Sequence, residues 1–266
     1  MNTHSMIAVA GATGRVGRHV VGVLRERGHE VVAMSRSSGV DVISGAGLAE
    51  ALVGVECVID TATGPSPEEQ AATTFFTTAA RNLHAVGQVA GVQRLVVVSI
   101  IGCDRFTAGY GAAKIAHERA ALSGPIPALI LRAAQFHDFV AQLVDWGRQG
   151  DVSYVQQMRT QLVAARTVAE KLVELATSPT SQVPRTSIPE IAGPREESLV
   201  EMARLLVAHR GESLRIEAVS YPSDPDRDVY ESGALLPGRD ATLAGPTFEE
   251  WLTSASGVPP VAARAR

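Results

Sequence analysis

The chain has 266 residues, of which 45% are hydrophobic, and its formal net charge is -4. This length and composition fit one large globular α/β domain, or one such domain carrying a small appendage. The absence of a basic stripe or a Lys/Arg run argues against a nucleic-acid partner. The two distant cysteines, Cys57 and Cys103, are not spaced as a disulfide framework or a metal cluster, so no metal site is predicted.

The first half of the sequence alternates short apolar runs with amphipathic stretches. Residues 6–10 predict a buried strand, 15–27 a helix that ends at Gly28, and 30–34 a second strand, which together form one βαβ unit. Further strands are expected at 55–60, 94–99 and 128–132, and further helices at 48–53, 68–90, 110–122 and 135–146. Near-continuous apolar strands that alternate with helices predict an α/β fold with a doubly wound parallel sheet, the Rossmann fold.

This alternation stops near residue 150. Residues 152–163 look irregular, whereas helices are expected at 167–177, 196–209 and 224–233 and a strand at 214–219. The tail 255–266 is expected to fray. The sequence therefore predicts a Rossmann core over residues 1–150 and a small α+β cap over 151–266. The cap would partly complete the core sheet and lie over its carboxyl edge, where open α/β sheets bind ligands.

A glycine-rich turn joins the first strand to the first helix. Its glycines are spaced so that the first two admit a tight turn and a close phosphate, and the third lets helix and strand pack closely. Backbone N–H groups at a helix N-terminus bind paired phosphates well. Because strand, turn, helix and next strand stand in the required order, residues 1–150 are predicted to bind NAD(P) through Gly11, Ala12, Thr13, Gly14, Arg15, Val16 and Gly17.

The end of the second strand predicts which dinucleotide is preferred. An acidic residue there would bind the ribose hydroxyls of NAD, but this chain has Ser35 and Arg36. An arginine can pair with the 2′-phosphate of NADP, and Arg15 in the glycine turn can reach the same group. NADP(H) is therefore favoured and NAD(H) is the alternative, while the competing interpretation is that each arginine is a solvated surface residue.

Two further loops are expected to touch the cofactor. Asp41 follows the second strand and is expected near the adenine, and a small-residue loop follows the third strand at Thr61, Ala62 and Thr63. Asp60, just before that loop, is interpreted as a cap for it.

Tyr110 and Lys114 are the candidate catalytic pair. Their spacing of four places both side chains on one face of a helix. A nearby cation favours the phenolate and so lowers a tyrosine pKa, which suits proton transfer in carbonyl/alcohol redox chemistry. Ser99, at the end of a central strand, is expected to donate a hydrogen bond to the same substrate oxygen. The competing interpretation is a core tyrosine beside a solvated lysine; His117 is expected to be structural.

These segments resemble the extended and atypical short-chain dehydrogenase/reductases, especially the NmrA-like branch. The resemblance spans about residues 6–252 and rests on the glycine turn, the strand that ends at Ser99, the Tyr110/Lys114 pair, residues 130–133 and the ending 246–251. It implies that Tyr110 is the acid/base, that Lys114 binds the nicotinamide ribose and that Ser99 orients the substrate carbonyl. The chain departs from the family pattern at Ala133 and Thr167, where proline and aspartate are usual.

The function that follows is an NADPH-dependent oxidoreductase that transfers hydride to a small carbonyl, quinone or enone. The alternative is a non-catalytic NADP(H)-sensing regulatory protein, as in several NmrA-like members; an isomerase or epimerase with tightly held cofactor could use the same residues. The expected substrate-lining residues, each of which taken alone is more often a core residue than a contact, are Gln135, Phe136, His137, Phe139, Trp146 and Tyr154. We expect a small-molecule partner, no membrane partner, a monomer or homodimer, and a cytoplasmic location, because the N-terminus resembles neither a signal peptide nor a membrane span.

Overall fold

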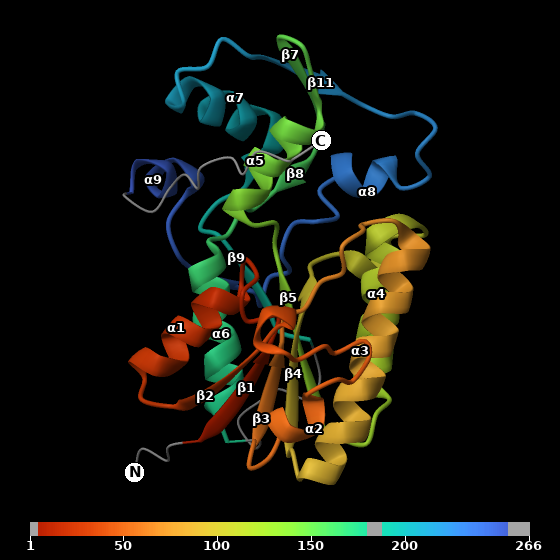
Figure 1. Cartoon of the computed structure of the whole chain (residues 1–266). Coiled ribbons are helices and arrows are strands. Elements are labelled where there is room, and N and C mark those ends of the chain that lie inside the picture. The colour runs from red at the N-terminus through yellow and green to blue at the C-terminus, as the bar shows by residue number, and fades with distance from the viewer. Residues whose placement is uncertain (1–4, 180–187, 255–266) are drawn as a thin grey trace.

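The computed structural model describes residues 5–179 and 188–254, so the tail 255–266 of the predicted cap lies outside the described residues. These ranges form a seven-stranded main sheet and a second lobe above it (Figure 1). The main sheet has the order β12-β9-β5-β4-β3-β1-β2 and all its pairings are parallel. Its strands are β1 (Met6–Ala10), β2 (Glu30–Met34), β3 (Cys57–Asp60), β4 (Arg94–Ile100), β5 (Ala128–Ala133), β9 (Glu190–Ala192) and β12 (Thr242–Leu243).

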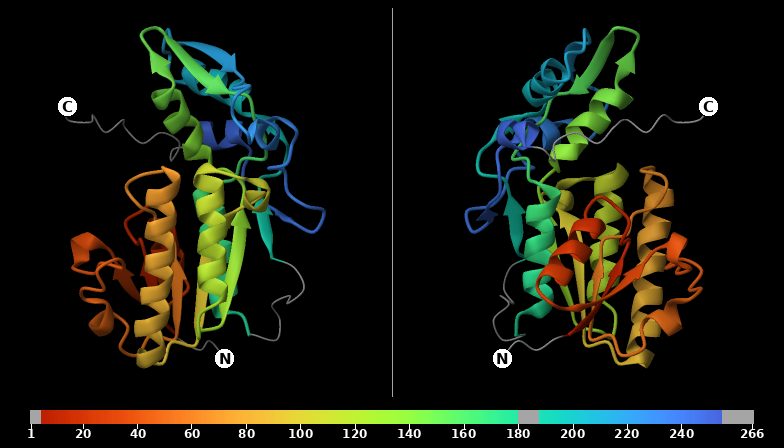
Figure 2. Two further views of the ribbon diagram at one scale, coloured as in Figure 1. Left: turned by 90° about the vertical axis from the view of Figure 1, so that its right-hand side faces the viewer. Right: turned by 60° about the vertical axis from the view of Figure 1, so that its left-hand side comes forward.

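Helices cover both faces of this sheet, which is why its central strands are apolar on both sides. One face packs against α1 (Gly17–Glu26) and α6 (Ala165–Thr177). The other packs against α2 (Leu48–Ala51), α3 (Glu69–Ala90) and α4 (Gly109–Leu122). Figure 2 shows these two helical layers on either side of the sheet. The predicted Rossmann fold is confirmed.

The strand order reverses between β1 and β3. From β1 the chain moves outward to β2, then returns past β1 to β3 and continues in the opposite direction through β4 and β5. A crevice forms at the carboxyl ends of the strands where such a reversal occurs, and this is where open α/β sheets bind their ligands. The glycine turn after β1 and the loop after β3 therefore face each other at the edge where a dinucleotide would lie.

The second lobe has its own apolar core. It contains α5 (His137–Trp146), α7 (Leu199–His209), α8 (Arg227–Glu231), α9 (Phe248–Thr253), a small sheet of β6 (Arg148–Gln149), β7 (Val152–Gln156) and β11 (Arg215–Val219), and the pair β8 (Arg159–Thr160) and β10 (Glu197–Ser198). Its buried side chains include Val140, Val155, Leu206 and Phe248. Because α5 contributes to this core, the chain enters the second lobe before residue 150; the division into core and cap stays a prediction.

One expectation about this lobe was wrong. Residues 152–163 were expected to be irregular, but they contain β7 and β8, and β7 pairs in parallel with β11. β7 is only five residues long and its polar and apolar residues do not alternate strictly, and its partner is some 60 residues away in sequence, so local periodicity gave a weak signal. None of the helices in the described ranges combines the length and the hydrophobicity that a bilayer crossing requires.

Candidate functional site

The glycine turn adopts the conformation that its sequence predicts. Gly11 has a φ of +73°, and a Cβ there would lie 2.8 Å from Cα of Ala62 in the loop after β3. A Cβ on Gly17 would overlap the carbonyl oxygen of Gly11 and lie 2.8 Å from Oγ1 of Thr61. Both glycines are therefore required for the close approach of the turn, the first helix and the neighbouring loop.

Several amide groups of this turn remain available to a ligand. Gly14 N–H donates to the Gly11 carbonyl and Ala12 N–H to the Met34 carbonyl. Within the described residues, the N–H groups of Thr13, Arg15 and Val16 have no backbone acceptor and no side chain caps α1. Unsatisfied amides at a helix start carry partial positive charge and bind phosphate. The turn thus has the geometry and the donors that a dinucleotide diphosphate needs.

The residues that follow β2 lie at the part of this edge where the sequence predicts the adenosine half of a dinucleotide. Ser35 caps a short 3₁₀ turn (Arg36–Ser38), and the Arg36 side chain is exposed. In the part of the chain that the structure describes, the Arg36 guanidinium makes no hydrogen bond or ion pair. Asp41 lies further along, where its carboxylate accepts the Ile43 N–H at 2.8 Å. Arg36 is therefore free to meet an added anion, whereas Asp41 is engaged in its own loop.

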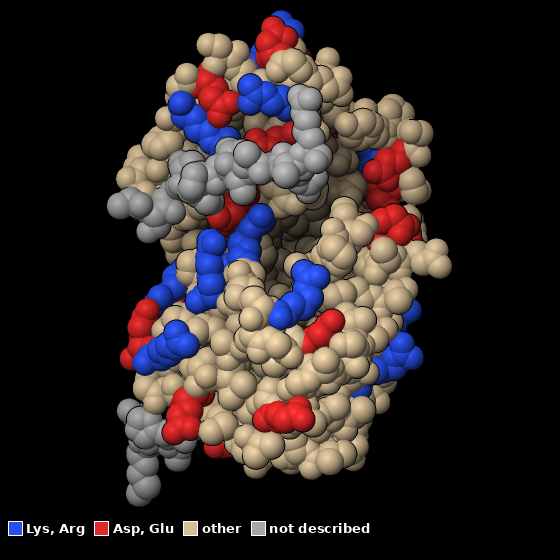
Figure 3. Space-filling model, in the orientation of Figure 1, with Lys and Arg blue, Asp and Glu red and all other residues tan. Residues whose placement is uncertain are grey.

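Arg15 points toward the second lobe. Its Nη2 donates to Oε1 of Gln142 on α5 at 3.0 Å, so this side chain bridges the turn and the second lobe. The space-filling view shows a deep hollow between the two lobes, with Lys or Arg side chains along its margin (Figure 3).

The loop after β3 forms the opposite wall of the edge. Thr61 ties the loop to β1, because its N–H and its hydroxyl both donate to the Ala10 carbonyl, at 3.0 and 2.7 Å. Ala62 contacts the glycine turn, and the Thr63 hydroxyl lies 3.2 Å from the Tyr110 phenol. The structure thus brings the predicted loop residues and the predicted acid/base together.

Tyr110 and Lys114 occupy the first turns of α4, as their spacing predicts. The expected electrostatic tuning of Tyr110 is, however, not what the structure gives. Burial raises the pKa of Tyr110, opposed by its hydrogen bond with Thr63, and Lys114 does not lower it. The reason is that the Lys114 ammonium points inward, donating to the Val98 carbonyl at 2.9 Å and contacting Nδ1 of His117 at 2.9 Å.

Ser99 is buried with only 2% of its surface exposed, and it does not reach the Tyr110 phenol. Its hydroxyl lies 3.6 Å from the Cys103 thiol, beside an ion pair between Glu118 and Arg132 with N–O distances of 3.0 and 2.9 Å. Strand alternation explains this, since Ser99 shares the sheet face of Leu95 and Val97. In this structure the side chain therefore belongs to a buried polar cluster, and its role in orienting a carbonyl stays a prediction.

The expected substrate-lining residues do not gather in one place. His137 is fully buried in the cap core between Phe248 and Trp251, with ring centroids 5.6 and 5.2 Å away, and burial lowers its pKa to about 4. Gln135 accepts the Thr160 hydroxyl at 2.5 Å. The others are dispersed: Phe136 packs against the core cluster, Phe139 is half-buried on α5, Trp146 is 52% exposed and Tyr154 is 38% exposed. Their contact with a substrate stays a prediction, and His137 is a core residue in this structure.

Two features of the site were not predicted from the sequence. Asp60 and His117 join Lys114 in a buried chain, although His117 was expected to be structural only. Asp226, from the cap, accepts the N–H groups of Thr107 and Ala108 at 2.9 and 3.0 Å, immediately before the start of α4. Nothing in the local sequence around residue 226 indicates a partner about 120 residues away, so this contact required the fold.

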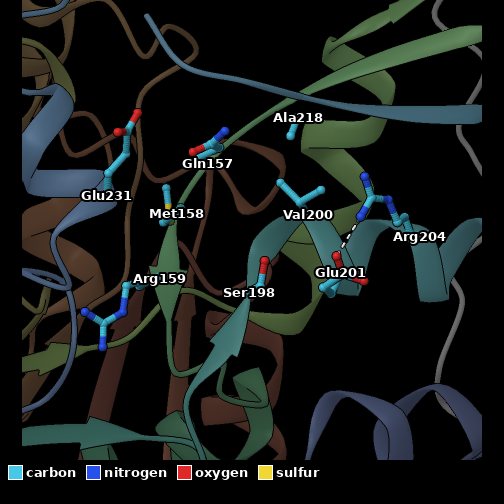
Figure 4. A pocket seen from close by; sticks show the side chains of 9 residues that line it. All are labelled: Gln157, Met158, Arg159, Ser198, Val200, Glu201, Arg204, Ala218 and Glu231. Carbon is cyan, nitrogen blue, oxygen red and sulfur yellow. Dashed lines mark hydrogen bonds and ion pairs between the residues drawn. The ribbon is translucent and has the colours of Figure 1, made fainter.

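A separate hollow of about 290 Å³ lies within the cap (Figure 4). An ion pair between Glu201 and Arg204, 2.6 Å apart, crosses one side of it. None of the residues that line it is a predicted site residue: they are Gln157, Met158, Arg159, Ser198, Val200, Glu201, Arg204, Ala218 and Glu231. This hollow is therefore distinct from the edge described above.

The fold, the open amides and the glycine turn define a Rossmann protein with unpaired amide donors at its switch point, where a dinucleotide site is predicted. Comparison with known families agrees, since residues 11–179 match a family described as NAD(P)H-binding. The chain belongs to this NAD(P)H-binding family, as the sequence predicted. No curated protein matches it.

Several solved structures have a similar fold, and one of them is a short-chain dehydrogenase/reductase superfamily protein. An NAD-dependent NDP-hexosamine 5,6-dehydratase of tunicamycin biosynthesis is 19% identical, with 92% of this chain and 94% of that chain covered and a TM-score of 0.66. A dTDP-4-dehydrorhamnose reductase from Bacillus anthracis in complex with NADP is 17% identical, covering 93% and 97%, with a TM-score of 0.66. A short-chain dehydrogenase/reductase superfamily protein from Agrobacterium tumefaciens with bound NAD is 19% identical, covering 82% and 86%, with a TM-score of 0.61. These likenesses confirm the Rossmann fold.

Proposed function

We propose that this protein is an NADPH-dependent oxidoreductase that reduces a small carbonyl, quinone or enone. One observation carries the proposal: the open amides of Thr13, Arg15 and Val16 and the Tyr110 phenol lie at the same carboxyl edge, joined through the loop after β3 that contains Thr63. A dinucleotide seated on the turn would therefore extend toward a proton donor. The solved neighbours bind NAD or NADP, which supports a nicotinamide cofactor but leaves the choice to this chain's own residues.

Arg36 supports NADP(H) over NAD(H). Its guanidinium is exposed, has no partner among the described residues and stands directly after β2, where the adenosine ribose would lie. A 2′-phosphate would pair with it, whereas an unmodified ribose would leave it in water. The single carboxylate further along, Asp41, already accepts a backbone N–H in its own loop.

The proposed chemistry follows from the protonation state of Tyr110. When bound, NADPH would supply the hydride. Because burial raises its pKa, Tyr110 is a neutral phenol at physiological pH and can donate a proton to the oxygen of a carbonyl that is being reduced. Thr63, at 3.2 Å, holds the hydroxyl in place.

A second candidate, a non-catalytic NADP(H) sensor, is favoured by one observation. The Lys114 ammonium faces Val98 and His117 rather than the Tyr110 phenol, so the pair is not arranged to form a phenolate. A sensor would need the amide cradle and a shape change that a partner recognises, but no proton donor.

The two candidates are separated by kinetics and binding on the same proteins. NADPH oxidation is followed across quinones, aldehydes and ketones for the wild type and for Tyr110→Phe, with exposed Tyr221→Phe as the matched control. We expect Tyr110→Phe to lose about 10²- to 10⁴-fold in turnover of an aldehyde or ketone with unchanged NADPH affinity, because only the proton donor is removed. Tight NADPH binding with no turnover of any substrate by the wild type would instead establish the sensor.

A further inference from the structure

A buried chain of three titratable side chains runs beneath the predicted cofactor loop. Asp60 ends β3, and its Oδ2 lies 3.1 Å from Nε2 of His117 on α4. Nδ1 of His117 lies 2.9 Å from the Lys114 ammonium, which also donates to the Val98 carbonyl. All three side chains are buried, with exposures of 1%, 1% and 5% for Asp60, His117 and Lys114.

The protonation of the chain follows from its donors and acceptors. An ammonium can only donate, so Nδ1 of His117 must be the acceptor from Lys114. Nε2 then carries the proton and donates to the Asp60 carboxylate. Burial, followed by the neighbouring Lys114, lowers the pKa of His117, which agrees with a neutral imidazole between two charges. The ring also stacks on Phe76, with centroids 4.6 Å apart, which fixes its orientation.

The charges around Lys114 single out Asp60 as its counter-ion. Three acidic groups face the ammonium: Asp60 from β3, Glu118 from α4 and the Cys103 thiol from the turn after β4. Glu118 is already paired with Arg132. Burial raises the pKa of Cys103 to about 11, so this thiol is neutral at physiological pH. Asp60, reached through His117, is the negative charge that remains to balance Lys114.

Asp60 is also tied to the cofactor loop. Its Oδ1 accepts the Ala62 N–H at 2.9 Å, so one carboxylate holds both the backbone of the loop and the imidazole. The Phe76 ring also contacts Lys114, whose ammonium nitrogen lies 4.4 Å from the ring centroid. The same ring packs edge-on against Tyr110, with centroids 5.8 Å apart. The three hydrogen-bonded side chains therefore link the loop after β3, Lys114 and the surroundings of the Tyr110 phenol.

We propose that Asp60 and His117 are positioning residues that keep Lys114 charged and fixed beneath the cofactor loop. The inference rests on the proposed function together with the family resemblance, which implies that this lysine serves the nicotinamide ribose. Without the hydrogen bonds that link Asp60, His117 and Lys114, a lysine so deeply buried would lose its proton. Burial lowers the pKa of Lys114 to about 8 even with Asp60 opposing the shift. The arrangement also explains why the ammonium turns inward from Tyr110.

The test uses the fact that the chain has only two lysines, Lys114 and Lys171. Biosynthetic ¹³Cε labelling of lysine gives two NMR signals, and Lys171, which pairs with Glu174 on α6, is an internal reference. The titration of the Lys114 signal is followed in the ligand-free protein for the wild type, His117→Phe, His117→Gln and Asp60→Asn. Phenylalanine keeps a ring that can stack on Phe76, whereas glutamine keeps one donor and one acceptor.

We expect His117→Phe and Asp60→Asn to shift the Lys114 titration midpoint downward by about 1 to 2 pH units, the size that loss of a charge-assisted hydrogen bond produces. His117→Gln should restore most of the wild-type midpoint. In parallel, NADPH affinity of the Phe and Asn variants should lie within about twofold of the wild type at pH 6 and fall about 5- to 50-fold below it at pH 8, where Lys114 would be largely neutral in the variants but half-charged in the wild type.

A Lys114 midpoint that is unchanged in both Asp60→Asn and His117→Phe would overturn the inference. If His117→Phe fails to fold, Asp60→Asn alone decides it, because this change keeps the shape of the side chain and one acceptor oxygen while it removes the charge. If the wild type does not bind NADPH but the midpoints shift as expected, the proposed function is wrong. The role of Asp60 and His117 in keeping a buried lysine charged is then still supported.

Discussion

Two glycines of α1 should respond to alanine in opposite directions. Gly17 begins the helix and Gly22 lies in its middle, one and a half turns later. A Cβ on Gly17 would overlap the Gly11 carbonyl oxygen and lie 2.8 Å from both the Gly11 carbonyl carbon and Oγ1 of Thr61. A Cβ on Gly22 would meet only the far end of the Glu26 side chain, at 4.0 Å.

The magnitudes follow from these contacts. The atoms that oppose a Cβ at Gly17 include backbone, so the helix must move away from the turn, and overpacking of this kind costs about 1–3 kcal/mol. For a chain of this size the midpoint of thermal unfolding should fall by roughly 2–4 °C for each kcal/mol. Gly22→Ala should instead stabilise the protein by about 0.5–1 kcal/mol, because alanine loses less backbone entropy in a helix.

The assay is thermal unfolding together with calorimetric titration of NADPH on both variants and the wild type. Gly17→Ala should also weaken NADPH binding at least about tenfold, or about 1.4 kcal/mol, since the displaced turn no longer presents its amides at one point. Gly22→Ala should bind like the wild type. Equal stability and equal NADPH affinity of the two variants would refute the view that close packing of turn, helix and loop builds the site.

Three further predictions follow from single side chains. Arg36→Ala should weaken NADPH binding about 10- to 100-fold and leave NADH binding unchanged, as measured by calorimetry with exposed Arg25→Ala as the control. An equal loss for both dinucleotides would contradict the role of Arg36 at a 2′-phosphate. Asp226→Asn should lower stability by about 1–3 kcal/mol and reduce turnover, because the carboxylate accepts from Thr107 and Ala108 just before α4, whereas Asp228→Asn, at an exposed acid, should change neither. His137→Leu should remove part of the acid sensitivity of folding: burial lowers the His137 pKa from 6.5 to about 4, so the unfolded chain binds more protons between these values, and stability falls by up to about 3 kcal/mol as pH drops through this window. Urea unfolding at pH 4 and pH 7 measures that slope, and an equal slope in the wild type and His137→Leu would contradict it.

Much of the core could be predicted from sequence because its signals are local. The buried runs at 6–10, 30–34 and 94–99 and the glycine spacing each report on neighbouring residues, and every one of these elements forms where expected. The helix that carries Tyr110 and Lys114, expected at 110–122, likewise forms as α4 over Gly109–Leu122. The match to the NAD(P)H-binding family, over residues 11–179, includes most of these segments.

The directions of side chains at the site could not be predicted in the same way. A spacing of four places Tyr110 and Lys114 on one helix face, but it does not say that the longer side chain turns inward to His117. Ser99 lies near the end of β4, as predicted. The alternation of side chains along the strand, however, points it toward Glu118 and Cys103. His137 looked like a candidate ligand contact and is a core residue, because α5 buries it against α9, more than 100 residues further along the chain.

The contacts between core and cap explain how the site can be assembled from distant segments. Asp226 fixes the backbone just before α4, with its two oxygens accepting two N–H groups and the Thr107 hydroxyl. On the opposite side, Arg15 gives one hydrogen bond to the neutral amide of Gln142. The first contact has a charged acceptor and three hydrogen bonds, so it holds the loop before α4 to the second lobe. The second is a single bond to an uncharged acceptor, so a phosphate oxygen would compete well for Arg15. Seating a dinucleotide would then release the cap at Gln142 while Asp226 retains the loop that positions Tyr110.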